Sequence, residues 1–239
     1  YDLPIAIGII AASEQKRFSG LDKYLIMGEL GLDGSVREVQ GALPIADLVT
    51  DMGLSGCILP LRSALEATEC KELSIFGVET LTDVLRILEG VEDCSDLLVW
   101  NTRLYRKLTR NSLRERKPAG QEVMDFSEII GQEGAKRGVE IAAAGGHNLI
   151  MVGPPGSGKS SLAKAMTGIL PPMTTDEAIV TSKIYSVAGM KGSQIGLIRT
   201  RPFRAPHYSA SLAAIIGGGA GSDIRPGEVT LAQNGILFL

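Results

Sequence analysis

The sequence predicts an α/β fold in two regions, residues 1–98 and 125–239, joined by a basic linker at 99–124. Three observations predict this organisation. Short apolar runs alternate with helix-like stretches through the first region. In the second region a glycine-rich loop lies between an apolar run and a helix-forming run, which is typical of nucleotide-binding α/β domains. Lys and Arg then dominate the stretch between the two regions, which ends at a Pro/Gly break.

Composition limits the classes of protein. The 239 residues are 44% hydrophobic and 21% charged, with a net charge of −3, which fits a soluble globular protein and gives no general signal for nucleic acid. The apolar stretch at 3–12 is shorter than the roughly 20 residues of a membrane helix. Three cysteines without metal-ligand spacing predict a cytoplasmic location, and two isolated histidines predict no zinc site.

The first region is expected to alternate helices and strands. Asp2 and Pro4 mark a helix start, and two further local signals are specific. Asp33-Gly34 predicts a hairpin turn, and Thr80 predicts a helix cap. Helices are predicted over 5–12, 42–51, 63–70 and 81–89, and strands over 24–30, 35–39, 56–61 and 73–78.

The linker contains many basic residues between 103 and 117, with one Glu, and reaches its break at 118–121. We interpret it as a solvated helical or extended segment. The alternative is an arm that faces DNA, since clustered Lys and Arg neutralise phosphates.

The strongest chemical signal is the stretch HNLIMVGPPGSGKSSLAKAM, in which residues 153–160 match the phosphate-loop pattern G-x-x-x-x-G-K-[ST]. A strand is predicted before it at 148–152 and a helix after it at 161–167. The glycines let backbone N–H groups turn inward around an anion, and the helix adds its positive end. The alternative is a plain glycine-rich turn with an exposed lysine.

These residues predict a site for ATP and Mg²⁺. Lys159 is expected to reach the β- and γ-phosphates as the catalytic lysine, and the Ser160 hydroxyl to bind Mg²⁺. The expected nucleotide contacts in the loop are Gly153, Pro154, Pro155, Gly156, Ser157, Gly158, Lys159, Ser160 and Ser161.

Upstream, residues 129–132 (IIGQ) precede a helix-like run at 133–144. This order resembles AAA+ ATPases, in which a hydrophobic–Gly–Gln element packs against adenine, and the resemblance implies contacts from Ile130 and Gly131. The alternative is an ordinary helix entry with Gly131 as a turn residue.

The last residues, NGILFL, predict a buried parallel strand. In AAA+ ATPases the strand beside the phosphate loop ends in two acidic residues, which orient Mg²⁺ and polarise the attacking water. We expect those acids to follow Leu239. We also expect the chain to be cut at both ends and inactive in hydrolysis by itself.

Three further stretches carry a family resemblance, namely SKIYSVAGM (182–190), IRTRPFRAPHYSAS (198–211) and GGGAGSDIRPGEVTLAQNGILFL (217–239). In this order, after a phosphate loop, they resemble the magnesium chelatase-related AAA+ family, and within it the YifB/ComM group. That group usually has His-His where this chain has His207-Tyr208. The resemblance implies a P-loop AAA+ α/β/α domain over 125–239.

The first region resembles the Lon-protease-like domain at the front of these proteins, a two-layer α/β domain of the ribosomal-S5 type. The protease serine is expected before Tyr1. Pro44 stands at the place of the catalytic lysine, in the stretch QGALPIAD. Proline has no amine to act as a base, so we expect no proteolysis.

Arg199, Arg201 and Arg204 are interleaved with Phe203, His207 and Tyr208. Three interpretations stay open: single-stranded nucleic acid, a contact between ring subunits, or pairing with nearby carboxylates. His207 is expected to be structural. A mobile loop at 217–221 is expected to face DNA in a pore.

The resemblance implies a hexameric ring with ATP between subunits, acting as a DNA branch-migration helicase in natural transformation. The alternatives are a magnesium chelatase motor, a nucleotide-gated scaffold without turnover, and a Lon-like peptidase, which Pro44 argues against.

Overall fold

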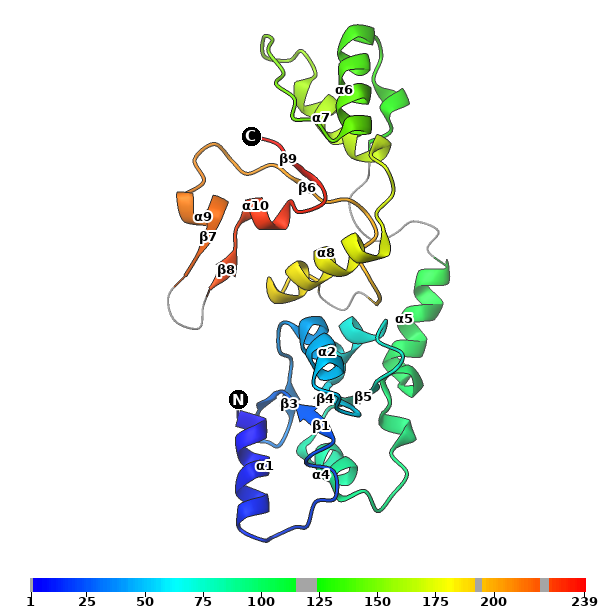
Figure 1. Cartoon of the computed structure of the whole chain (residues 1–239), viewed down its shortest axis with the longest axis vertical. Helices are drawn as coiled ribbons and strands as arrows, with labels where there is room; N and C mark the ends of the chain where they lie inside the picture. The colour runs from blue at the N-terminus through cyan, green and yellow to red at the C-terminus, as the bar shows by residue number, and fades with distance from the viewer. Residues whose placement is uncertain (1, 115–123, 192–194, 220–223) are drawn as a thin grey trace. The chain divides into compact units, whose positions relative to one another are not determined.

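The computed structural model describes residues 2–114, 124–191, 195–219 and 224–239 (Figure 1). Contacts divide the chain into two units. The first comprises 1–118 and 182–197, and the second comprises 119–181 and 198–239. The fold is mixed α/β with a parallel sheet, which confirms the predicted fold class at this level. Residues 182–197, which the sequence places in the second region, belong by their contacts to the first unit.

The first unit is built on a three-stranded parallel sheet in the order β1-β4-β5. The strands are β1 (Tyr24–Ile26), β4 (Gly56–Pro60) and β5 (Ser74–Val78). Every residue of the central strand β4 is buried. Strands of a parallel sheet are covered on both faces, which explains the unbroken apolar run in β4.

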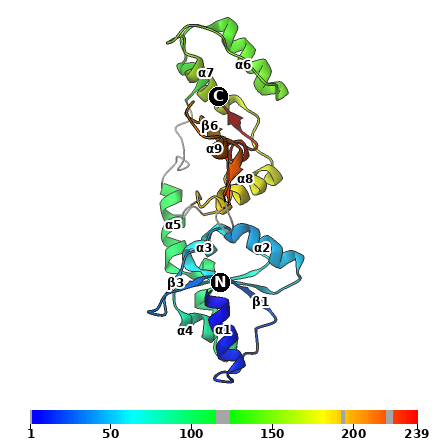
Figure 2. The same ribbon diagram turned by 90° about the vertical axis from the view of Figure 1, so that its left-hand side faces the viewer.

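Helices lie on both faces of this sheet (Figure 2). Cys57 and Leu59 of β4 pack into one core with α2 (Ala42–Asp51) and α3 (Leu61–Ala64). Ile58 points the other way, into a core with α1 (Asp2–Ala12) and α4 (Leu81–Glu89). The described part of this unit therefore has three layers, and the predicted two-layer arrangement is wrong for it. The cause is the period of two along β4, where both alternating sets are apolar.

The Asp33-Gly34 hairpin is confirmed. Strands β2 (Glu29–Leu30) and β3 (Val36–Arg37) pair antiparallel around it. Gly34 has a φ of 81°, and Asp33 Oδ1 accepts hydrogen bonds from the amide and hydroxyl of Ser35. The single strand predicted at 24–30 is two strands instead. At the break, a Cβ on Gly28 would lie 2.8 Å from Leu3 Cδ2 and 2.9 Å from Val36 Cγ1, so those side chains would have to shift to admit it.

The predicted cap of α4 is also confirmed. Thr80 accepts from the Asp83 amide at 3.3 Å, and Asp83 accepts from the Thr80 amide at 2.9 Å. The helix ends at Gly90, which has a φ of 65°. The helix predicted at 63–70 is shorter, because α3 gives way to a 3₁₀ turn, η1 (Leu65–Ala67). Two more 3₁₀ turns follow α4, η2 (Ser95–Leu97) and η3 (Val99–Asn101).

The basic linker begins as a helix, α5 (Arg103–Arg114). Leu104, Tyr105 and Leu108 of this helix pack against the core that contains Cys57. The front of the linker is therefore part of the first unit. The predicted break at 118–121 lies outside the described residues.

In the second unit, α6 (Glu133–Gly145) and α7 (Lys159–Ile169) pack through Val139, Leu162 and Met166. The turn η4 (Phe126–Glu128) precedes α6. Helix α8 (Thr175–Val187) begins in this unit, and its residues from Ser182 belong to the first unit. The remaining elements are β6 (Phe203–Arg204), α9 (Leu212–Ile216), β7 (Gly217–Gly218), β8 (Arg225–Pro226), α10 (Glu228–Leu231) and β9 (Ile236–Leu237).

The strand predicted at 148–152 does not form among the described residues, and Ile150 and Val152 are exposed. The strand predicted at the end of the chain forms as β9, but its predicted burial is wrong, because Ile236 and Leu237 are only half-buried and Leu239 is exposed. Strand β9 pairs in parallel with β6, through Phe203↔Ile236, and not with the residues before the phosphate loop. Of the loop expected at 217–221, residues 217–218 form β7, which pairs with β8, and 220–221 lie outside the described residues. No helix within the described ranges is long and apolar enough to cross a membrane.

Candidate nucleotide site

The phosphate-loop residues form a turn that leads directly into α7. Gly156 and Gly158 have φ angles of 80° and 85°, and Gly158 is the N-cap of the helix. A Cβ at either glycine would meet no atom within 4 Å. The left-handed backbone, and not a lack of space, therefore selects glycine at these two positions.

Lys159 folds back over the loop. Its ammonium donates to the carbonyl oxygens of Gly153 and Pro154, both at 2.8 Å, and to Ser157 Oγ at 3.3 Å. These contacts place a positive charge beside the first turn of α7. The first amides of a helix have no intrahelical acceptor, so this end of α7 offers several N–H donors next to the ammonium.

A cavity of about 420 Å³ lies between α6 and the loop. This volume is in the usual range for small-molecule sites. Its polar side is formed by Gln132, Ser157 and Lys159, and its apolar side includes Val139 and residues 149–152. The Gln132 amide donates to the Ser157 carbonyl at 3.1 Å, which ties the start of α6 to the loop.

The structure brings together part of the predicted set. Gly153, Pro154, Ser157 and Lys159 line the cavity, whereas Pro155, Gly156 and Gly158 complete the turn. Ser160 and Ser161 lie in the first turn of α7.

The upstream element is arranged differently from the expectation. Ile130 is 95% exposed, and neither Ile130 nor Gly131 lines the cavity. Ile129 packs against the core of the second unit. The apolar side comes from residues 149–152, which the sequence analysis assigned to a strand, and Gln132 is the upstream residue that reaches the cavity.

The residues present fit a nucleotide phosphate. The loop supplies backbone conformations that glycine permits, an ammonium, and the N-terminal end of an eleven-residue helix. For Mg²⁺ they offer the Ser160 hydroxyl, and no group of three or more His, Cys, Asp or Glu side chains gathers for a metal in the parts of the chain described.

The three arginines after α8 have different surroundings. Arg201 donates to the Pro171 carbonyl at 2.6 Å, to the Asn234 carbonyl at 2.8 Å and to Glu177 at 3.0 Å. Arg204 makes two bonds to the Glu228 carboxylate, at 2.5 and 2.6 Å. Arg199 is exposed. Two of the three charges thus face carboxylates of their own unit.

These pairs change the acidity of the glutamates. The hydrogen bond from Arg204 lowers the pKa of Glu228. The Thr174 amide, followed by the Arg201 guanidinium, lowers the pKa of Glu177. Nearby, His207 Nδ1 lies 2.7 Å from Ser209 Oγ, and the Tyr208 ring is 94% exposed.

The turn signal before the last strand did not predict the long-range contacts that Asn234 and Gly235 make. Asn234 has a φ of 60°, and its amide donates to the Glu177 carbonyl and to Thr181 Oγ1, both at 3.2 Å. A Cβ on Gly235 would lie 2.0 Å from the Pro202 carbonyl oxygen. The Asn-Gly dipeptide is a turn signal that points to both residues.

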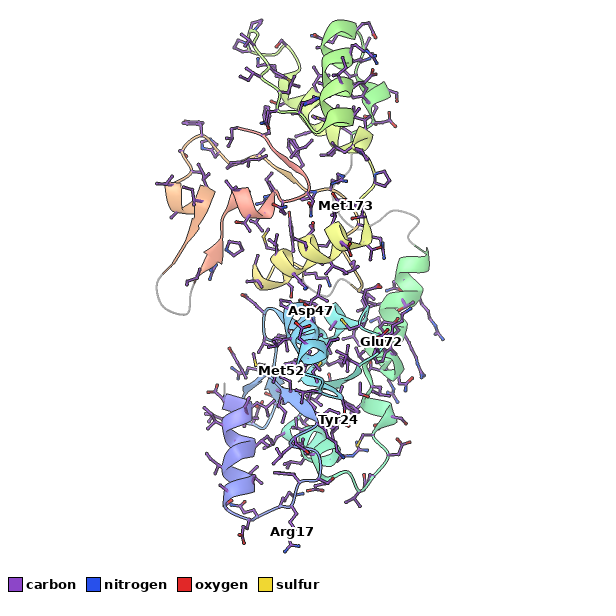
Figure 3. All side chains as sticks on the ribbon, viewed as in Figure 1. Arg17, Tyr24, Asp47, Met52, Glu72 and Met173 are labelled. Carbon is purple, nitrogen blue, oxygen red and sulfur yellow. The ribbon has the colours of Figure 1, made fainter. Side chains whose placement is uncertain are left out.

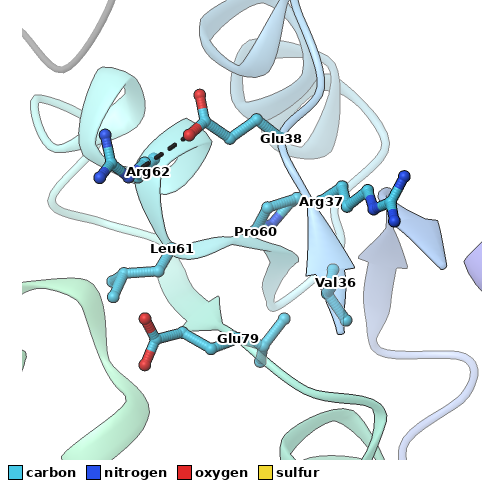
Figure 4. A pocket seen from close by; sticks show the side chains of 8 residues that line it. Val36, Arg37, Glu38, Pro60, Leu61, Arg62 and Glu79 are labelled. Carbon is cyan, nitrogen blue, oxygen red and sulfur yellow. Dashed lines mark ion pairs between the residues drawn. The ribbon is translucent and has the colours of Figure 1, made fainter. Parts of the chain in front are cut away.

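The first unit has a separate hollow of about 520 Å³ at the ends of β4 and β5 (Figure 4). Arg62 and Glu38 form an ion pair at its edge, with Nε and Oε1 3.4 Å apart. Leu61 and Glu79 also line it. None of its lining residues belongs to the predicted site. Pro44, which the resemblance predicts to stand at the position of the protease lysine, lies in the first turn of α2.

Comparisons with known proteins agree with the motifs. The family model described as "Magnesium chelatase, subunit ChlI" matches residues 125–239, and one described as "Subunit ChlI of Mg-chelatase" matches 1–63. All 239 residues align at 41% identity with competence protein ComM of Haemophilus influenzae, and at 41% with the uncharacterized protein YifB of Salmonella typhimurium. The chain belongs to the magnesium chelatase-related YifB/ComM family.

This YifB/ComM-family chain spans 44% of the length of each of those two relatives. It is also 38% identical over 76 residues to an archaeal Lon protease of Halobacterium salinarum, which is 28% of this chain and 11% of that protein. The resemblance inferred from the motifs after the phosphate loop is confirmed.

Proposed function

We propose that this chain carries the nucleotide-binding part of an AAA+ ATPase that works as a motor. The observation that carries the proposal is the arrangement of Lys159 over a glycine turn at the start of α7, beside a cavity of about 420 Å³. Membership of a magnesium chelatase-related family supports it. The domain assignments, AAA+ for 125–239 and Lon-like for 1–98, belong to the same proposal.

In this proposal the chain's own residues bind and orient the nucleotide. The loop amides and Lys159 hold the β- and γ-phosphates, and Gln132 with the apolar wall of the cavity holds the base end. Ser160 would help to hold Mg²⁺ together with the phosphates, and the ion would supply charge neutralisation during phosphoryl transfer. The hypothesis includes three further expectations for the complete protein. Acidic residues activate the attacking water, and the subunits form a hexameric ring. The Lon-like domain, with Pro44 in place of a catalytic lysine, has no protease activity.

A fluorescent ATP analogue tests the site directly. Lys159→Ala removes charge-assisted hydrogen bonds worth about 1.5–3 kcal/mol each, so two of them predict affinity at least about 100-fold weaker. Lys164→Ala is the matched control, because Lys164 is exposed on the same helix. Equal affinities for Lys159→Ala and the parent protein would remove the site from the proposal.

We further propose that the complete protein moves on DNA, as a branch-migration helicase in natural transformation. The name of the relative in Haemophilus influenzae, a competence protein, supports this direction. The exposed side chain of Arg199 makes it the clearest candidate contact among the three arginines. Arg201 and Arg204 are less suited, because their removal also breaks ion pairs with Glu177 and Glu228.

Arg199→Ala is expected to weaken binding to single-stranded DNA and to reduce the slope of log affinity against log salt by about one. Arg137→Ala on α6, also exposed, serves as the control and should leave both unchanged. An unaltered salt slope in Arg199→Ala would assign Arg199 to another role.

A magnesium chelatase motor is the second candidate, favoured by the description of the family model over 125–239. The similarity to a Lon protease favours the first candidate, because the Lon-like front region is typical of the YifB/ComM group. ATP hydrolysis by the complete protein, with and without branched DNA, separates them. Stimulation by DNA supports the DNA motor, turnover indifferent to DNA supports the chelatase type, and binding without any turnover supports a scaffold.

A further inference from the structure

A buried polar cluster fixes residues 182–191 to the rest of the first unit. Ser186, Lys191 and Glu66 are 0%, 4% and 6% exposed. The Ser186 hydroxyl donates to the Glu66 carboxylate, and the Lys191 ammonium donates to the Glu66 carbonyl oxygen at 2.9 Å. Glu66 of η1 therefore accepts hydrogen bonds from two side chains of residues 182–191.

Further contacts surround the cluster. The Gly41 amide donates to the Ser186 carbonyl at 3.1 Å. Lys183 pairs with Asp47 of α2, with Nζ and Oδ2 2.5 Å apart (Figure 3 labels Asp47). This second pair is more open to solvent, with side chains 31% and 52% exposed. Residues 182–191 thus have one buried hydrogen-bonded attachment and one more exposed ion pair to the same unit.

Buried ionisable groups are an expensive way to fasten a segment, because both must leave water. Burial lowers the pKa of Lys191 to about 8, although Glu66, Glu69 and Cys70 act in the opposite direction. Burial also raises the pKa of Glu66, against the Ser186 hydrogen bond and Lys191, and Glu38 raises it further. Two further charged pairs lie on the elements packed here, Asp47 with Lys183 and Glu38 with Arg62, and the second pair lines the same hollow as Glu66.

We propose that residues 182–191 form a releasable latch on the first unit, and that the proton on the Lys191 amine governs its closing. A neutral amine still donates to the Glu66 carbonyl, so loss of the proton keeps the hydrogen bond and removes the cost of burying charge. At low pH, protonation of the Glu66 carboxylate also favours the closed latch.

The sign and size follow from proton linkage. The closed latch holds Lys191 with a pKa of about 8, and an open latch has the ordinary value of 10.5. Between these values the open form binds more protons, so closing strengthens as the pH rises through 8 and levels off above 10.5. The closing constant is expected to rise about tenfold between pH 7 and pH 9.

Hydrogen exchange of the peptide 183–191, corrected for intrinsic rates, measures this closing. Protection in the parent protein should rise about tenfold from pH 7 to pH 9, while peptides from α4 should not change. In Lys191→Gln, which keeps a donor and removes the titrating amine, the rise should disappear. Lys183→Gln, at the exposed pair, should retain it.

Several results would overturn the latch. A flat profile in the parent protein, or a rise that survives in Lys191→Gln, would show that the Lys191 proton does not control closing. An equal rise in α4 would show whole-unit unfolding instead of local release. If Lys191→Gln does not fold, the profiles of the parent and of Lys183→Gln still decide, since both must rise.

Discussion

Gly235→Ala is expected to break the pairing of β9 with β6. The new Cβ would lie 2.0 Å from the Pro202 carbonyl oxygen and 2.7 Å from two ring carbons of Pro202. Ordinary contact begins near 3.4 Å, so the backbone must shift by about 1.4 Å (3.4 − 2.0). The same carbonyl accepts from the Ile236 amide at 2.8 Å, and the Arg204 carbonyl accepts from the Phe238 amide at 2.8 Å.

The loss of stability in Gly235→Ala has two contributions, steric overpacking and weakened hydrogen bonds. Overpacking of a tight site costs about 1–3 kcal/mol, and each of the two hydrogen bonds that the shift weakens contributes about 0.5–1.5 kcal/mol. We expect a loss of about 3 kcal/mol in the free energy of unfolding. For a unit of this size, roughly 4 °C per kcal/mol gives a fall in melting temperature of about 12 °C. Urea and thermal unfolding followed by circular dichroism measure both quantities.

Gly134→Ala is the matched control, since Gly134 lies within α6 and a Cβ there meets no atom within 4 Å. Alanine is the better helix former, and in the first turn of α6 this change should stabilise the second unit by a fraction of the roughly 1 kcal/mol that it is worth in a helix interior. The two substitutions are chemically identical and should move stability in opposite directions. A Gly235→Ala protein that unfolds within 0.5 kcal/mol of the parent would refute the steric reasoning.

Two other substitutions test local contacts. Thr80→Ala removes the capping box of α4 and should cost about 1 kcal/mol in urea unfolding, whereas Thr80→Ser should retain most of the stability. Arg204 lowers the pKa of Glu228, so this pair stabilises the protein above pH 4.5 and its contribution is lost as the pH falls through the lowered value. Glu228→Gln should therefore reduce stability at pH 7 and flatten the decline of stability below pH 4.5, as followed by urea midpoints.

Local signals in the sequence predicted local structure well. The helix at 42–51, the Asp33-Gly34 turn and the Thr80 cap all form at the predicted residues. Each depends on side chains within a few positions of one another, so the neighbouring sequence contains the whole cause. The phosphate loop is similar, because glycine conformations and a helix start define it.

Long-range partners were harder to predict. The run at 148–152 has the composition of a strand, yet pairing needs a neighbour, and the described residues supply none for it. The number of layers in the first unit also depended on long-range partners. The apolar run in β4 indicated burial on both faces, and the number of layers depended on where α1 and α4 pack, which sequence spacing does not specify.

The arginines illustrate the same distinction in the candidate site. Sequence spacing placed Arg199, Arg201 and Arg204 together and left three roles open. The structure separates them, because carboxylates that lie 24 positions away in each case, Glu177 and Glu228, pair with two of them. Such partners are invisible to a local motif, although they decide how much charge remains for a ligand. If a variant of Arg201 or Arg204 weakens DNA binding, its stability must also be measured, because the substitution breaks an ion pair. For a variant of Arg199, the change in DNA affinity can be interpreted more directly.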